Sequence, residues 1–193
     1  WKARSEFLTT MLTSRGMVVT GETGCGKTTQ IPQFLNEVSP DARIVICQPR
    51  RLAATGVAAR VADEMSCKLG DEVGYMVRGD SACGPKTRLV FMTYGVLLRR
   101  LQGDPDLAHI DYVILDEVHE RGMDSDFGLG LLCAALGRVS CKFKLVLMSA
   151  TISTDKFAEY LGKAVAGFFS TAAMKNVSNR PHPSLIQPSP VLF

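Results

Sequence analysis

The sequence predicts an α/β protein in which a doubly wound, mostly parallel sheet is flanked by helices. Short apolar runs alternate with helical stretches along the chain. The runs are apolar on both faces, which is typical of strands buried inside a parallel sheet. A length of 193 residues suffices for one well-buried domain and is too short for two of full size. Repeated strand–helix–strand units imply right-handed crossovers, and ligands of such sheets bind at the carboxyl ends of the strands.

Each predicted element rests on a local pattern. Compact apolar runs predict strands at residues 17–20, 43–47, 73–77, 88–92, 112–115 and 145–148. Helical stretches between them lie at 27–37, 52–65, 95–101, 126–138 and 154–161, the last with Ser153 as its N-cap. From about Gly162 the pattern weakens, and residues 176–193 carry four prolines. We therefore predict a packed domain at 1–175 and an extended, Pro-rich arm or linker at 176–193.

The composition is that of an ordinary globular domain. Hydrophobic residues make up 46% and charged residues 21%, which argues against disorder or a fibrous repeat. No apolar run approaches the ~20 residues that a membrane-spanning helix needs, so we expect a soluble domain with no membrane partner. A net charge of +3 permits contact with polyanions without requiring it.

The cysteine pattern favours reduced core thiols. None of the six cysteines forms a C-x-x-C pair, and several lie in apolar runs, where a free thiol behaves as a small hydrophobic group. We therefore expect an intracellular protein, with a zinc site or a disulfide framework as the disfavoured alternatives. Because the chain begins at Trp1, we expect it to be a piece of a longer protein, and the absence of a targeting signal is uninformative.

A glycine-rich segment reading GETGCGKT follows the first predicted strand and opens the next helix. It fits G-x-x-x-x-G-K-[ST] in the strand–loop–helix context that this motif requires. Gly24, Cys25 and Gly26 would turn backbone N–H groups toward phosphate oxygens at a helix N-terminus. Lys27 would supply a charge for the β- and γ-phosphates, and the Thr28 hydroxyl would ligate Mg²⁺. The alternative, a purely structural glycine turn, is disfavoured by the placement, so we predict binding of a nucleoside triphosphate.

An acidic pair follows the predicted strand at 112–115. Asp116 lies at the carboxyl end of that strand, where P-loop enzymes hold Mg²⁺, and we expect it to act through a water molecule. Glu117 is suited to orient or deprotonate an attacking water, so Asp116, Glu117 and Lys27 are candidate catalytic residues. The alternative is a solvated charge cluster at a strand end, which the nearby phosphate loop disfavours.

His119 has two interpretations. It is either a satisfied polar residue on the turn, or a catalytic coupling residue bonded to the segment Ser149-Ala150-Thr151. Alone, the first interpretation would be preferred. The predicted strand at 145–148 favours the second, because its exit would lie next to the site.

These motifs together resemble the DEAH/DExH-box RNA helicases of superfamily 2, in particular their first RecA-like domain. The sequence carries GETGCGKTTQ, QPRR, TYGVLL, DEVHER and SAT in the family's order, and the resemblance runs from residue 1 to about 187. Cys25, Val118 and the GVLLRRL stretch are similar to the branch that contains RNA helicase A and the G-quadruplex-resolving helicases. The prolines near residue 181 resemble the strand that leads to the family's second RecA-like domain.

The resemblance implies contacts with RNA. Arg50, Arg51, Thr93 and Gly95 lie in motifs that touch the RNA sugar-phosphate backbone in the family, and such contacts do not read base edges. On the residues alone, a solvated helix start is the more natural interpretation of the two arginines. Tyr94 departs from the aspartate or threonine that is usual in the family, and an aromatic ring there could stack on a base.

The resemblance also assigns nucleotide and coupling residues. Arg60 matches an arginine that stacks on the adenine ring in relatives, which implies that several triphosphates besides ATP are accepted. Thr29 is a further phosphate contact. Ser149 and Thr151 are implied as coupling residues.

We therefore expect the first motor domain of an ATP-dependent RNA helicase, which uses Mg²⁺ and ATP for RNA unwinding or RNP remodelling. The implied partners are RNA, a second RecA-like domain, C-terminal domains of the same chain and protein activators. The sequence has no Q-x-x-G-R-x-G-R stretch, with which the family completes its active site, so the isolated chain should be nearly inactive. The alternatives are a nucleotide-gated RNA-binding or scaffold module without productive turnover, and another P-loop ATPase or DNA translocase.

Overall fold

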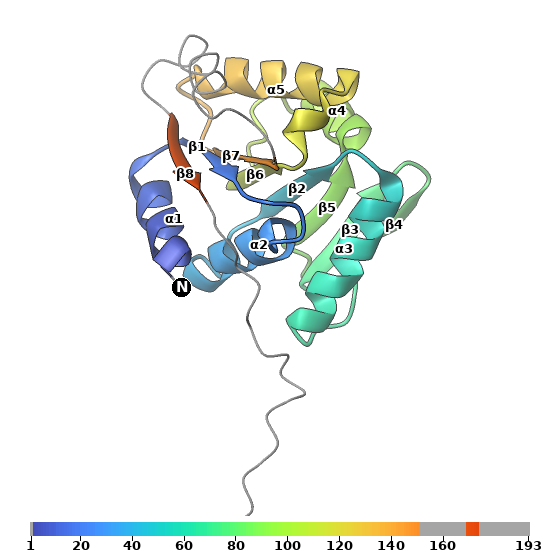
Figure 1. The fold of residues 1–193 in the computed structure, drawn as a ribbon. Helices are drawn as coiled ribbons and strands as arrows, with labels where there is room; N and C mark the ends of the chain where they lie inside the picture. Colours follow the sequence, from blue (N-terminus) through green and yellow to red (C-terminus); the bar gives the residue numbers. More distant parts are fainter. Residues whose placement is uncertain (1, 151–168, 174–193) are drawn as a thin grey trace, which may run out of the picture.

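A single twisted sheet forms the middle layer of the protein (Figure 1). The computed structural model describes residues 2–150 and 169–173 of the chain. Within them, eight strands are ordered β4-β3-β5-β2-β6-β7-β1-β8, and all neighbours are parallel except the antiparallel hairpin β3–β4. The strands are β1 (Gly16–Thr20), β2 (Ile44–Gln48), β3 (Val73–Val77), β4 (Asp80–Ala82), β5 (Leu89–Thr93), β6 (Tyr112–Leu115), β7 (Lys144–Ser149) and β8 (Phe169–Ala173).

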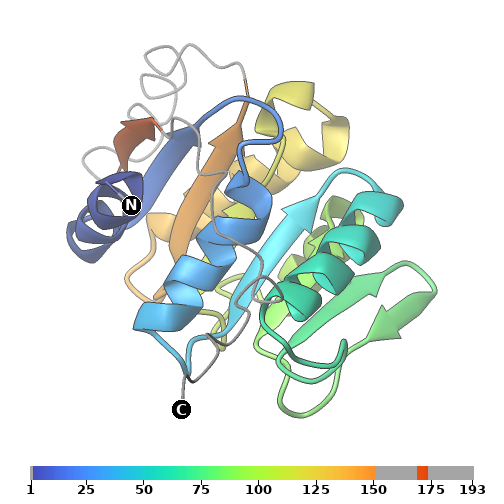
Figure 2. The ribbon, with the colours of Figure 1, turned by 60° about the horizontal axis from the view of Figure 1, so that its bottom comes forward.

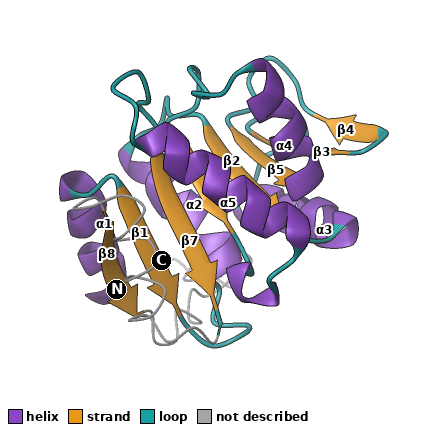
Figure 3. Cartoon of the chain, turned by 90° about the horizontal axis from the view of Figure 1, so that it is seen from above, coloured by secondary structure: helices purple, strands orange, loops and turns teal. Residues whose placement is uncertain are grey.

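Helices cover both faces of the sheet. One face carries α1, α2 and α3, which lie in front of the sheet in Figure 2, and the other carries α4 and α5, which lie in front in Figure 3. A short 3₁₀ helix, η1, follows β6. The helices are α1 (Lys2–Thr13), α2 (Lys27–Val38), α3 (Arg51–Glu64), α4 (Tyr94–Gly103), η1 (Val118–Glu120) and α5 (Met123–Leu136). The α/β class and the doubly wound sheet predicted from the sequence are confirmed.

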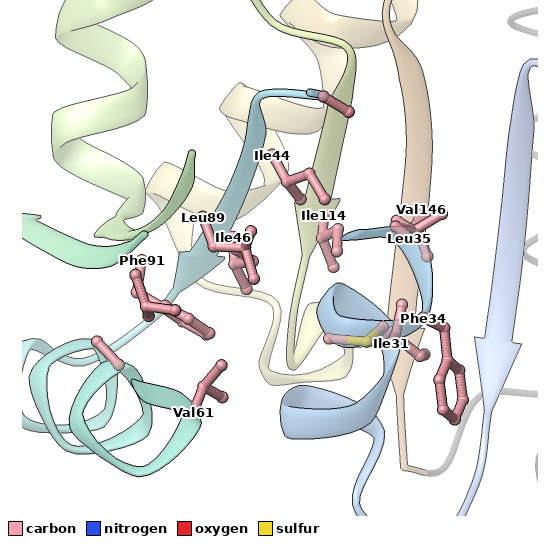
Figure 4. Close-up of a cluster of buried hydrophobic side chains, with 14 of the residues drawn as sticks. Ile31, Phe34, Leu35, Ile44, Ile46, Val61, Leu89, Phe91, Ile114 and Val146 are labelled. Carbon is pink, nitrogen blue, oxygen red and sulfur yellow. The ribbon is translucent and has the colours of Figure 1, made fainter. Parts of the chain in front are cut away.

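Alternate side chains of the central strands pack into two separate hydrophobic cores, one on each face of the sheet. On β2, Ile44 and Ile46 join the core under α1, α2 and α3, whereas Val45 and Cys47 join the core under α4 and α5. Figure 4 shows part of the first of these cores, in which side chains of the strands, such as Ile46 and Phe91, lie together with side chains of α2 and α3. Strands buried on both faces explain why the apolar runs lack a polar alternation.

The predicted strands and the four predicted helices that fall in the described residues are confirmed, with ends displaced by up to three residues. The largest displacement is in α5, which begins at Met123 rather than at 126. Four elements were not predicted: α1, β4, η1 and β8. The predicted helix at 154–161 and the arm at 176–193 lie outside the described residues.

All six cysteines are free thiols, and four of them are buried. Burial raises the pKa of Cys133 to about 11, so this thiol stays protonated in the core. Among the described residues, no group of three or more His, Cys, Asp or Glu side chains is arranged to hold a metal ion. None of the helices in the described part of the chain is both long and apolar enough to cross a membrane.

Candidate active site

The phosphate loop connects β1 to α2, as predicted. Gly24 and Gly26 have φ angles of 81° and 87°, a left-handed conformation that glycine adopts without steric cost. Gly26 is the N-cap of α2, and no side chain caps this helix end. The first N–H groups of α2 are therefore available to an anion at the mouth of the loop.

Lys27 is folded into the loop. Its side chain is only 5% exposed, and its Nζ donates hydrogen bonds to the carbonyl oxygens of Gly21 (2.5 Å) and Glu22 (2.9 Å). The Sγ of Cys25 lies 3.7 Å from the same ammonium. Two backbone carbonyls thus accept the hydrogen bonds of the ammonium, a role that the motif gives to phosphate oxygens.

Asp116 is the buried centre of the site. It is 1% exposed, and its Oδ2 accepts hydrogen bonds from Thr28 Oγ1 (2.6 Å) and from Gln48 Nε2 (2.8 Å). Its Oδ1 accepts a hydrogen bond of 2.9 Å from the backbone N–H of Glu117. Burial raises the pKa of Asp116, and the hydrogen bonds from Thr28 and Gln48 act against this by favouring the charged form.

Glu117 has an unusual backbone for its residue type. Its φ of 54° lies in the left-handed region, which only the surroundings can maintain for a residue with a side chain. Burial raises the pKa of its carboxyl group, and the neighbouring charge of Asp116 adds to the rise. The nearby charges of His119 and Lys27 lower it. A carboxylate with a raised pKa is suited to accept a proton.

His119 faces two partners through one ring nitrogen. Its Nδ1 lies 3.3 Å from Glu117 Oε2, and the backbone N–H of Ala150 points at the same atom from 3.5 Å. The first contact needs a proton on Nδ1 and the second needs a lone pair, so the imidazole can serve only one of them at a time. The contact with Ala150 favours the coupling interpretation of His119 over that of an isolated turn residue. Ser149 is buried at the end of β7, where its carbonyl accepts a hydrogen bond from Gly21 N (3.2 Å).

Arg60 is tied to the helix of the phosphate loop through Glu64. Its Nε forms an ion pair of 2.9 Å with Glu64 Oε1. The other oxygen of Glu64 accepts hydrogen bonds from the Gln30 amide (3.1 Å) and the Gln33 amide (2.7 Å), both on α2. The side chain of Arg60 is nevertheless 70% exposed.

A groove of about 960 Å³ lies beside Glu117, at the carboxyl ends of β3 and β5. Three of the residues implied as RNA contacts, Arg51, Thr93 and Gly95, line it. The lining also holds two further arginines and three acidic residues: Arg78, Arg99, Glu117, Glu120 and Asp124. The fourth implied RNA contact, Arg50, does not line the groove. It forms an exposed ion pair of 3.1 Å with Glu120.

Tyr94 corrects one expectation. Its ring is 3% exposed, so it cannot stack on a base in this conformation. The hydroxyl instead donates a hydrogen bond of 2.6 Å to the backbone carbonyl of Asp116. The ring is buried because α4 begins at this residue and packs against α5.

The sequence of the chain was compared with those of known proteins and protein families. The chain matches the DEAD/DEAH box helicases over residues 1–159, a range that includes the phosphate loop, the acidic pair and His119. The chain belongs to the DEAD/DEAH box helicase family. It is 45% identical over 170 residues to the DExH-box ATP-dependent RNA helicase DExH1 of Arabidopsis thaliana, covering 85% of this chain and 17% of that protein. It is 44% identical over 172 residues to DExH3 of the same plant, covering 86% of this chain and 14% of that protein.

In this DEAD/DEAH box helicase chain, the RecA-like fold brings most of the predicted nucleotide-site residues close together. Thr28 and Asp116 meet directly, and Lys27 and Glu117 lie around them. These oxygen donors beside an anion-binding loop fit Mg²⁺, which binds one or two carboxylates together with substrate phosphates. Sequence reasoning assigned no role to Gln48, although a polar residue that ends an apolar strand beside the site was a usable signal. Thr151 lies outside the described residues.

Proposed function

We propose that this chain is the first RecA-like motor domain of an ATP-dependent RNA helicase. In the full-length protein it would couple hydrolysis of Mg-ATP to RNA unwinding or RNP remodelling. The observation that carries the proposal is the 2.6 Å hydrogen bond from Thr28 to Asp116, because it joins the phosphate loop and the acidic pair into one site. The two Arabidopsis relatives, whose names describe ATP-dependent RNA helicases, support it.

The loop would bind the triphosphate of ATP. Backbone N–H groups of residues 24–29 would surround the phosphates, and Lys27 would exchange its two carbonyl partners for β- and γ-phosphate oxygens. Thr28 and Asp116 would hold Mg²⁺, which neutralises charge on the phosphates when it is bound. Gln48 would keep the Asp116 carboxylate oriented while Thr28 turns toward the metal.

Glu117 would act as the general base. It would take a proton from the attacking water as the water oxygen bonds to the γ-phosphorus. The bond between that phosphorus and the β–γ bridging oxygen breaks, and ADP and phosphate leave. His119 contacts both Glu117 and the backbone at the end of β7. It would couple the protonation of the Glu117 carboxylate to the segment that follows β7.

The groove would hold the RNA backbone. Arg51 can pair with phosphate oxygens, and the Thr93 hydroxyl and the exposed backbone at Gly95 can add hydrogen bonds. Contacts of this kind give binding without sequence preference. On the nucleotide side, stacking of Arg60 on the base without reading its edges would allow triphosphates other than ATP.

A second RecA-like domain of the same protein would complete the site. The chain spans 17% and 14% of the length of the two relatives, so most of such a protein lies outside it. An arginine supplied by a second domain can be worth about 10³–10⁵ in rate. We therefore expect the isolated 193 residues to bind nucleotide, hydrolyse it very slowly and unwind nothing.

The test measures ATP hydrolysis by the full-length protein with single-stranded RNA, with single-stranded DNA of the same sequence, and with neither. We expect stimulation by RNA and its loss in Lys27→Ala. ATP binding without stimulated hydrolysis would favour a nucleotide-gated scaffold, and stronger stimulation by DNA would favour a translocase. Brisk turnover by the isolated chain would contradict the role given to the second domain.

A further inference from the structure

The buried side chain of Tyr94 connects the start of α4, beside the groove, to the backbone of Asp116. The backbone of Tyr94 lies between Thr93 and Gly95, both of which line the groove, and α4 begins at Tyr94. Its hydroxyl reaches across the core to the carbonyl oxygen of Asp116 at 2.6 Å. Glu117 also lines the groove, and the Tyr94 hydroxyl adds a link from the start of α4 to the backbone of the acidic pair.

The acceptor of this hydrogen bond belongs to a peptide unit with a specific task. The carbonyl of Asp116 and the N–H of Glu117 form one planar unit, and both of its polar ends are held. Tyr94 binds the oxygen end, and Asp116 Oδ1 accepts from the N–H end at 2.9 Å. The tilt of this unit sets the φ of Glu117, which is 54° and left-handed. The hydroxyl of Tyr94 thus helps to maintain the backbone conformation that aims Glu117.

The phenol is suited to this task. Burial raises the pKa of Tyr94 well above its usual range, so the hydroxyl remains a neutral donor across the physiological range. The ring lies against α5, where a Cβ built on Gly128 would meet its Cδ1 at 3.9 Å. The ring of Tyr94 is packed and its hydroxyl is hydrogen-bonded. A displacement of the backbone at the start of α4 would therefore also displace the Asp116–Glu117 peptide.

We propose that the Tyr94 hydroxyl is a positioning group that couples occupancy of the groove to the placement of Glu117. RNA held by Thr93 and Gly95 would fix the start of α4, and through Tyr94 it would fix the peptide that orients the base. The inference rests on the proposed function, because it requires RNA in the groove and ATP hydrolysis by Glu117. Tyr94 also lines the groove, but its hydroxyl is bonded to the Asp116 carbonyl and would touch neither RNA nor nucleotide.

The test compares Tyr94→Phe with the unmodified full-length protein. The substitution keeps the ring and removes only the donor. We expect the RNA-stimulated kcat to fall about 3- to 10-fold, the effect of losing one buried hydrogen bond. The KM for ATP and the Kd for a fluorescently labelled single-stranded RNA should both stay within about 2-fold, because this hydroxyl contacts neither ligand.

Two control variants isolate the hydroxyl. Tyr112→Phe makes the same chemical change at the start of β6, the strand whose far end carries Asp116, and should leave every parameter unchanged. Gly128→Ala alters packing beside the ring while leaving the hydrogen bond in place, and should keep RNA stimulation.

Each other outcome has a distinct meaning. Full RNA-stimulated kcat in Tyr94→Phe would overturn the inference and leave the proposed function intact. A loss of RNA affinity equal to the loss of kcat, or a variant that fails to fold, would assign the hydroxyl to RNA binding or to stability and would also overturn it. An unmodified protein without RNA-stimulated hydrolysis would instead refute the proposed function.

Discussion

Thr28 donates a hydrogen bond of 2.6 Å to the carboxylate of Asp116, although the two residues are 88 positions apart in the chain. The contact forms because β1 and β6, which precede these residues, end at the same edge of the parallel sheet with only β7 between them. The hydroxyl and the carboxylate that would hold Mg²⁺ are thus brought together by the strand order of the folded chain.

The first prediction concerns this pair. Thr28→Val keeps the shape of the side chain and removes the donor, so magnesium-dependent ATP affinity should fall at least about 10-fold. Titration with a fluorescent ATP analogue, with and without EDTA, measures the effect. Thr9→Val, an exposed threonine on α1, is the control. Equal affinity for Mg-ATP in Thr28→Val and the unmodified protein would contradict the assignment.

The second prediction concerns pH. Glu117 must be ionised to accept a proton, and its pKa is raised. As the pH is lowered, RNA-stimulated turnover should therefore begin to fall at a higher pH than it would if the base were a glutamate with an unperturbed pKa. The charge of His119 lowers this pKa, so His119→Gln should move the acid limb of the kcat profile to still higher pH. A limb that stays in place, or moves to lower pH, would argue against Glu117 as the titrating base.

The third prediction concerns RNA. Each phosphate contact contributes about 0.7 to the slope of log affinity against log salt for a single strand. Arg51→Ala should therefore weaken RNA binding uniformly across sequences and reduce the slope by about that amount. Arg43→Ala removes an exposed arginine at the amino end of β2, at the opposite edge of the sheet, and should change neither quantity. Equal effects of both substitutions would place the RNA elsewhere.

The fourth prediction concerns α1. Phe7 is fully buried against the core, so Phe7→Ala should lower the free energy of unfolding by about 3–5 kcal/mol. Leu12→Ala, on the exposed side of the same helix, should change it by less than about 0.5 kcal/mol. Urea denaturation of the chain measures both. Equal stability of the two variants would show that α1 does not dock as the structure has it.

The sequence predicted best where residue type and local order fix the geometry. The phosphate loop must be a turn of glycines between a strand and a helix, so its place was predictable. α1 was missed because only Phe7 and Met11 of this helix are fully buried, with Leu8 partly buried beside them. β4 has three residues, only one of them not fully exposed, and carries no apolar run.

Contacts between distant segments were less predictable. Gln48 meets Asp116 because β2 lies beside β6, and strand order is decided by packing rather than by local pattern. The sequence left open that Tyr94 could stack on a base, because Thr93 and Gly95 are implied RNA contacts, yet its side chain is buried in the core at the first turn of α4. In both cases the sequence identified the segment but not the partner of the side chain.

We propose that Glu117 is the general base of an ATP-hydrolysing site in this chain. The most direct measurement is single-turnover hydrolysis of ATP by the full-length protein bound to RNA, comparing the unmodified protein with Glu117→Gln. We expect Glu117→Gln to bind Mg-ATP normally and to lose at least about 100-fold in the rate of phosphate formation. Undiminished phosphate formation by Glu117→Gln would contradict the claim.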